Sequence, residues 1–160
     1  DDSMLAGFDT NYKVNPPLRE KRDNDALIKG LNDGTIDVIC SGHVPHDEES
    51  KNLEFDHADP GIINLQTFAA NLALLSKHVD WPTLLEKVTV APRKVLDIES
   101  PVIDIEAKAN LTLLDPARTW LYDEKSNLSK AKNSPWLGQT LTGKVVAVFN
   151  NMKHWLDNSL

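Results

Sequence analysis

A short, almost uninterrupted apolar run at residues 35–40 (TIDVIC) constrains the fold more than any other stretch of the sequence. It is rich in β-branched residues, a pattern typical of a strand buried on both faces, as in a parallel sheet. The stretch before it predicts a helix, with Asp23 or Asn24 as the N-cap and Gly34 just after the C-cap. The apolar positions of this helix are Ala26, Leu27, Ile28 and Leu31. A helix followed by a buried strand favours α/β layering.

More helices are expected after a polar stretch. Apolar residues spaced by three and four predict a second helix over residues 62–78. Asp80 is a candidate N-cap for a third helix that has Pro82 in its first turn, and residues 92–96 predict a further helical turn. Residues 1–98 thus have the character of an α/β unit.

The pattern changes after Ile98, where short strand-like runs are separated by Asp-Pro, Asp-Glu and Ser-Pro pairs. These runs are residues 102–105, 111–114, 119–122 and 143–149. Asn150-Asn151 predicts a two-residue hairpin turn, because asparagine tolerates positive φ. We therefore expect two parts, an α/β part over residues 1–98 and a β-rich part over residues 99–160.

Composition removes several classes of partner. The formal charge of −7 argues against nucleic acid, because a protein that binds phosphate backbones needs a basic surface. The longest uncharged run, residues 60–76, is 17 residues long and contains polar side chains, which predicts a buried helix and no membrane partner. With Cys40 as its one cysteine, the chain cannot form an internal disulfide, so the expected location is cytoplasmic. We expect Cys40 to be a small buried strand residue. The first residue is Asp1 and not Met, which suggests a piece of a longer protein.

Residues 41–60 predict a functional loop, since they are polar, long and follow the buried strand, where α/β folds carry their sites. His43 and His46 lie three apart beside acidic residues, so they are candidates for half of a zinc site. The other interpretation is a polar loop whose histidines are exposed or bonded to backbone. The remaining histidines have no patterned partner and are expected on the surface or at caps: His57, His78 and His154.

A series of motifs runs in order along nearly the whole chain. They are FDTNYKVNPPLR (residues 8–19), GHVPH (42–46), EF (54–55), PGI (60–62), TVAPR (89–93), ANLTLLD (109–115), NSP (133–135) and GKVVA (143–147). Together they resemble the carboxyl-terminal part of bacterial dihydroorotases, members of the amidohydrolase superfamily. The spacing from Asn15 to Gly42, and from Gly42 to Pro60, fits that family without a gap.

The resemblance implies the last strand-helix units of a (β/α)8 TIM-like barrel, followed by strands of a small β-sandwich domain. It also implies a zinc-dependent enzyme that reversibly cyclises carbamoyl aspartate to dihydroorotate in pyrimidine biosynthesis. In that family zinc polarises the ring carbonyl and generates a hydroxide, and a carboxylate at the end of the eighth strand transfers the proton.

The resemblance assigns substrate contacts to four residues of this chain. Asn15 matches the asparagine that contacts the pyrimidine ring, and His46 matches the histidine that closes on the substrate. Pro60 and Gly61 match residues that offer backbone hydrogen bonds. Gly42 departs from the pattern, because it occupies the position of the family's metal-binding and proton-transferring aspartate, and glycine supplies neither a ligand nor a base.

Three interpretations follow. In the first, the chain is the carboxyl-terminal fragment of a dihydroorotase-like enzyme. It is then inactive when isolated and binds no metal alone, because the other zinc ligands would lie upstream of Asp1. In the second, it belongs to a non-catalytic homologue that assembles with a carbamoyltransferase, with proton transfer lost at Gly42. The third, a free-standing small binding domain, has little support, because a complete barrel needs about 250 residues.

Overall fold

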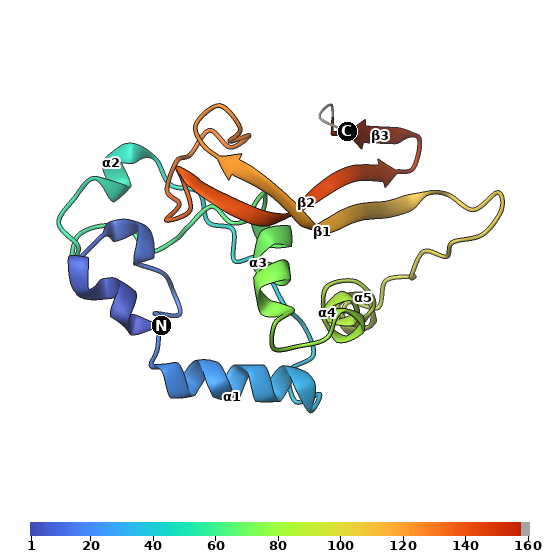
Figure 1. The fold of residues 1–160 in the computed structure, drawn as a ribbon, viewed down its shortest axis with the longest axis horizontal. Helices are drawn as coiled ribbons and strands as arrows, with labels where there is room; N and C mark the ends of the chain where they lie inside the picture. The colour runs from blue at the N-terminus through green and yellow to red at the C-terminus, as the bar shows by residue number, and fades with distance from the viewer. Residues whose placement is uncertain (158–160) are drawn as a thin grey trace.

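The computed structural model describes residues 1–157 of the chain (Figure 1), so the last three residues of the expected 99–160 part lie outside the described residues. Among the described residues, the helices lie in the first part of the chain and the strands, in one antiparallel sheet, lie in the second. The elements are η1 (Asp2–Gly7), η2 (Thr10–Tyr12), α1 (Lys21–Asn32), α2 (Glu48–Lys51), α3 (Phe68–Leu75), α4 (Trp81–Val88), α5 (Val90–Val95), β1 (Asn110–Tyr122), β2 (Gln139–Asn150) and β3 (Lys153–Leu156).

The sheet has the order β1-β2-β3, with both neighbouring pairs antiparallel. The predicted strands at 111–114 and 119–122 are one long strand, β1, whose pairing with β2 is interrupted between Asp115 and Thr119. Pro116 lies in this interruption and has no N–H to donate, so a break in the ladder is expected there. The prediction of a strand at 102–105 is wrong, because these exposed residues have no strand partner.

The hairpin between β2 and β3 is confirmed, one residue later than predicted. Asn150 pairs with Lys153, so Asn151 and Met152 form the two-residue turn. Asn151 has a φ of 56°, in the left-handed region that asparagine tolerates better than most residues.

The predicted helices are present, with shifted boundaries. α1 begins at Lys21, before the predicted N-cap, and Gly34 follows its C-cap with a φ of 82°. α4 begins as predicted, with the Asp80 carboxylate accepting the Thr83 N–H at 2.8 Å. The second predicted helix is shorter than expected, because α3 begins only at Phe68. Before Phe68 the backbone makes bonds outside a helix; for example, the Ile63 N–H donates to the Asn133 carbonyl.

The prediction of a buried strand at residues 35–40 is wrong. No strand forms there, and the N–H groups of Ile36 and Ile39 donate to the carbonyls of Gly30 and Lys87. A strand of a parallel sheet requires neighbouring strands to which it can hydrogen-bond, and the described residues provide no such strand beside this run. Cys40 is exposed, which corrects the expectation that it is buried.

The apolar core lies between α1, α3 and α4. Its buried members are Leu31, Leu72, Val79 and Leu84. The sheet packs on the other side of α3, so that this helix lies between the sheet and α1 (Figure 1). Among residues 1–157 no helix is both long and apolar enough to span a membrane.

Candidate functional site

Three segments that are distant in sequence meet at the carboxyl side of the 35–40 run. The loop of residues 43–46 contacts the segment 60–63, where Val44 N–H donates to the Ile62 carbonyl at 2.8 Å. The segment 60–63 also contacts the amino-terminal part, where Gly61 N–H donates to the Lys13 carbonyl at 2.8 Å. These contacts bring together the motifs that carry His46, Pro60, Gly61 and, two residues beyond Lys13, Asn15.

His46 links two of these segments through its ring. Its Nε2 lies 3.3 Å from the Pro60 carbonyl oxygen, and because a carbonyl only accepts, Nε2 carries the proton in this bond. Its Nδ1 lies 3.8 Å from a carboxylate oxygen of Asp59. The side chain is 22% exposed, so part of the ring remains accessible to a ligand.

An open cavity of about 230 Å³ adjoins His46. It is lined by Thr10, Asn11, His46, Asp47, Glu48, Lys51, Asn52, Lys132 and Asn133. Amide, hydroxyl and charged groups of both signs line it, which suits a small polar ligand more than an apolar one.

Asn133, which lies in the β-rich part of the chain, joins two loops, namely the loop 43–46 and the segment 60–63. Its Oδ1 accepts the backbone N–H of His46 at 3.1 Å. Its Nδ2 donates to the carbonyls of Val44 at 3.0 Å and Gly61 at 3.1 Å. Its own carbonyl accepts the Ile63 N–H at 2.9 Å. With 4% of its surface exposed, Asn133 is a buried and fully bonded amide.

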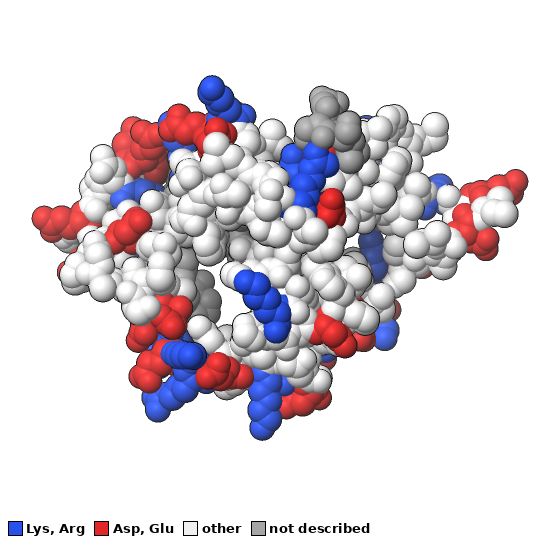
Figure 2. Space-filling view, viewed as in Figure 1, with Lys and Arg blue, Asp and Glu red and all other residues white. Residues whose placement is uncertain are grey.

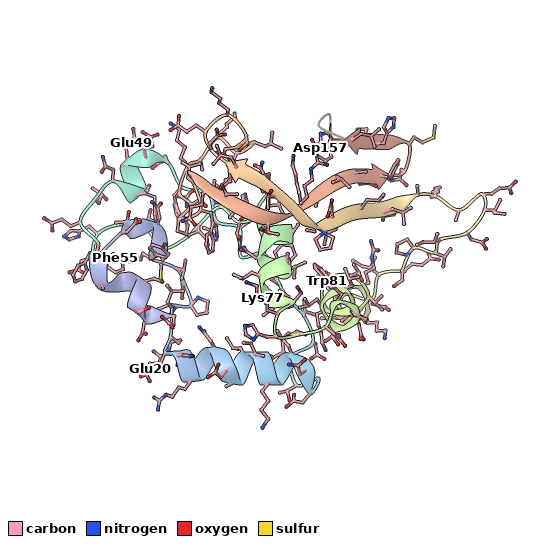
Figure 3. All side chains as sticks on the ribbon, viewed as in Figure 1. Glu20, Glu49, Phe55, Lys77, Trp81 and Asp157 are labelled. Carbon is pink, nitrogen blue, oxygen red and sulfur yellow. The ribbon has the colours of Figure 1, made fainter. Side chains whose placement is uncertain are left out.

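Two lysines bond to backbone carbonyls of the segment 55–61. The ammonium of Lys51, a residue 6% exposed, donates to the carbonyls of Asp59 at 2.8 Å and Gly61 at 3.2 Å. Burial lowers the pKa of Lys51, and the nearby charge of Lys13 lowers it further. Lys13 donates to the carbonyls of Phe55 and Asp56 and lies over the Phe55 ring, which packs against Phe8 near the amino-terminal 3-10 helices (Figure 3).

The acidic residues after His46 form a short helix, which the sequence did not predict. Asp47 caps α2, where its carboxylate accepts the Ser50 N–H at 2.7 Å. Hydrogen bonds from Ser50 lower the pKa of Asp47, so this carboxylate is ionised. It already accepts the N-cap hydrogen bond of α2. Glu48 pairs with Lys132 at 3.3 Å.

Gly42 has a φ of 58°, and a Cβ placed on it would have no atom within 4 Å. The next residue, His43, uses its Nδ1 to accept the N–H groups of Asn64 at 3.0 Å and Leu65 at 3.1 Å. Both histidines of the loop therefore bond to backbone, as the second interpretation of the loop expects. Within residues 1–157, no group of three or more His, Cys, Asp or Glu could hold a metal ion.

The four predicted substrate contacts differ in their surroundings. Asn15 and Pro60 are exposed, whereas Gly61 is buried. The backbone of Gly61 is fully used, because its N–H bonds to Lys13 and its carbonyl accepts from both Lys51 and Asn133. Of these four residues, only His46 lines the cavity.

Sequence reasoning missed Asn133 and Lys51. Asn133 lies 87 residues from its partner His46, and Lys51 resembles any other lysine of an acidic loop. One signal pointed to Asn133, namely its place in the NSP motif, to which no role was assigned.

Comparison with known proteins gives a consistent set of relatives. The chain is 46% identical over 147 residues to a dihydroorotase from Carboxydothermus hydrogenoformans and 42% identical over 144 residues to one from Geotalea daltonii. Each match covers 89% of this chain and 34% of the relative, so the chain spans about a third of the length of the curated relatives it matches. No protein-family model matches it.

Solved structures show the same fold at low identity. The L-hydantoinase from Arthrobacter aurescens matches with a TM-score of 0.81 at 23% identity, covering 97% of this chain and 36% of that one. A dihydroorotase from Campylobacter jejuni matches with a TM-score of 0.65 at 16% identity, covering 91% of this chain and 40% of that one. At such identities the likeness concerns the fold alone.

Proposed function

Since the chain belongs to the dihydroorotase family, we propose that it is the carboxyl-terminal portion of a cyclic amidohydrolase that interconverts dihydroorotate and carbamoyl aspartate in pyrimidine biosynthesis. The observation that carries the proposal is the identity of about two residues in five with dihydroorotases along nearly all of this chain. The meeting of His46, Pro60 and the 13–15 segment supports it.

Under this proposal the chain has two parts. Residues 1–98 would supply the last strand-helix units of a (β/α)8 barrel, and residues 99–160 would supply strands of a small β-domain. The packing of α3 against β2 fits one composite unit. In a complete barrel the 35–40 run would gain the neighbouring strands that it lacks here, and would then form the predicted strand.

The substrate contacts follow from the donors and acceptors available. The Pro60 carbonyl has a second lone pair, which would accept a ring N–H of dihydroorotate, and the Asn15 amide would pair with a ring amide. His46 would bond to the substrate from its accessible side. A contact from Gly61 N–H would require this group to leave the Lys13 carbonyl.

Zinc, which the family implies, does not fit the residues of this chain taken alone. Gly42 has no side chain, His43 Nδ1 already accepts two backbone N–H groups, and Asp47 caps α2. We therefore assign no metal ligand in this chain. The proposed cellular compartment is the cytoplasm, in keeping with a single cysteine and no internal disulfide.

Gly42 supports a second candidate function, a non-catalytic dihydroorotase homologue that assembles with a carbamoyltransferase. Loss of a positioned base alone lowers a rate by about 10² to 10⁴-fold. The open space around Gly42 would accept an aspartate, although its φ of 58° would strain most side chains.

The test is dihydroorotate hydrolysis by the full-length protein with zinc present, for the wild type, Gly42→Asp and His46→Ala. We expect wild-type turnover and a loss of about tenfold or more in kcat/KM for His46→Ala, because a substrate bond is removed. No turnover by the wild type, restored in Gly42→Asp, would support the non-catalytic homologue. No turnover by the wild type or by Gly42→Asp would overturn the enzymatic proposal.

The assembly function has its own measurement. If the second candidate is correct, the full-length protein and a carbamoyltransferase should co-sediment at micromolar concentrations in analytical ultracentrifugation. Independent sedimentation of the two proteins, with robust wild-type turnover, would exclude it.

A further inference from the structure

Asn133 belongs to neither of the loops that the proposed function places against substrate, yet it bonds to both. It lies in the connection between β1 and β2, in the β-rich part of the chain. Its side chain contacts residues 72 to 89 positions earlier in the sequence. It also lines the same cavity as His46.

The bonds of this amide are specific in direction. Oδ1 serves the loop 43–46 by accepting the His46 N–H, whereas Nδ2 bridges the loops by donating to the carbonyls of Val44 and Gly61. Only an amide offers an acceptor and two donors from one planar group. Because the group is buried, removing it would leave an N–H and two carbonyls without that partner, and the loops would have to move to satisfy them.

We propose that Asn133 is a positioning residue, which sets the placement of His46 relative to Pro60 and Gly61 and so fixes the distance between the two sides of the substrate site. This inference rests on the proposed function for the identity of the substrate. The placement itself rests on the three side-chain hydrogen bonds of Asn133. Through Asn133 the β-rich part of the chain would take part in substrate binding without touching the substrate.

Three variants of the full-length protein separate positioning from general stability. Asn133→Ala removes all three side-chain bonds. Asn133→Asp keeps an oxygen for the His46 N–H but replaces the donor that serves Val44 and Gly61. Asn127→Ala is the matched control, because Asn127 lies in the same connection and, among the described residues, its side chain bonds to Tyr122, Ser129 and Ala131 and to neither loop.

The first measurement is hydrogen–deuterium exchange with residue-level mass spectrometry. In Asn133→Ala we expect the His46 amide to exchange about tenfold faster or more, with β1 and β2 unchanged. In Asn133→Asp the His46 amide should exchange more slowly than in Asn133→Ala, because its acceptor is retained. In Asn127→Ala the amides of both loops should keep wild-type rates.

The second measurement is the division of the kinetic effect for dihydroorotate between KM and kcat. We expect Asn133→Ala to raise KM about tenfold with kcat within about threefold, because misplaced loops weaken substrate binding. Asn127→Ala should leave both constants near wild type.

The outcomes are separable. Unchanged His46 exchange in Asn133→Ala, or equal faster exchange throughout β1 and β2, would overturn the positioning role, as would an unchanged KM in an active enzyme. If the loop amides respond as expected but the wild type shows no turnover, the positioning stands and the proposed function fails.

Discussion

At the scale of single residues, Gly61 shows how closely the two loops of the site approach each other. A Cβ on Gly61 would lie 2.7 Å from Val44 Cγ1 and 3.0 Å from His46 Cδ2. Both distances are below ordinary van der Waals contact, so any larger residue would push the loop 43–46 away from the segment 60–63. Gly61 thus lies where the site has no room for a side chain.

Gly61→Ala should therefore destabilise the full-length protein by about 1–3 kcal/mol, the usual effect of overpacking. Under the proposed function it should also raise KM for dihydroorotate, because His46 is displaced. Urea denaturation and steady-state kinetics check this. Gly7→Ala is the control, since a Cβ at Gly7 meets nothing within 4 Å, and equal effects of the two variants would contradict the steric argument.

At the scale of elements, the sheet and α3 meet through small residues. A Cβ on Gly143, in β2, would lie 2.6 Å from the Ala73 Cβ and 3.1 Å from the Ala69 carbonyl oxygen of α3. The glycine lets the strand lie directly on the helix. This contact joins the β-rich part of the chain to the helical part.

Gly143→Ala should destabilise the protein by about 1–3 kcal/mol more than Gly138→Ala, because only the first variant forces β2 away from α3. The two glycines form a matched pair, since both have positive φ (97° and 83°) and Gly138 has no atom near its missing Cβ. Both variants therefore share the backbone strain. Chemical denaturation followed by circular dichroism would measure the difference, and similar midpoints would rule out a close contact.

At the scale of the whole molecule, a groove with a mostly apolar lining lies open at the surface. This groove of about 390 Å³ lies between α1 and the 35–40 run. It is lined by Asn24, Leu27, Ile28, Leu31, Ile36, Val38, Ile39 and Leu75. In the view of Figure 2, charged side chains of both signs lie along the edges of the molecule, and basic side chains also lie near the middle.

We predict that the 160-residue chain, prepared alone, binds a hydrophobic dye and self-associates, because exposed apolar surface of this kind favours association. Leu27, which is 56% exposed, lines the groove, so Leu27→Glu should reduce both properties. Ala26→Glu adds the same charge to an exposed neighbour on α1 that does not line the groove, and should leave both nearly unchanged. Sedimentation and dye fluorescence are the measurements. A wild-type chain that is monomeric and binds no dye would refute the prediction.

The sequence by itself determined the family and most of the elements. Asp80 capped α4 because an N-cap depends on a few adjacent residues, and the β2–β3 hairpin followed from local turn chemistry at Asn151. Local physics of this kind can be predicted from sequence. The 35–40 run has the composition of a strand, yet a strand needs partners that these residues lack, so the prediction of a strand there was wrong.

Only the tertiary structure decided how the site is held. That Asn133 bonds to the loops carrying His46 and Gly61, and that Lys51 is buried against the Asp59 and Gly61 carbonyls, depends on contacts between distant segments. No local pattern encodes such contacts, because one amide or ammonium is the same in sequence whether it faces solvent or bridges two loops. The residue types in the motifs therefore defined which chemistry was available, and the packing of the chain decided which groups meet.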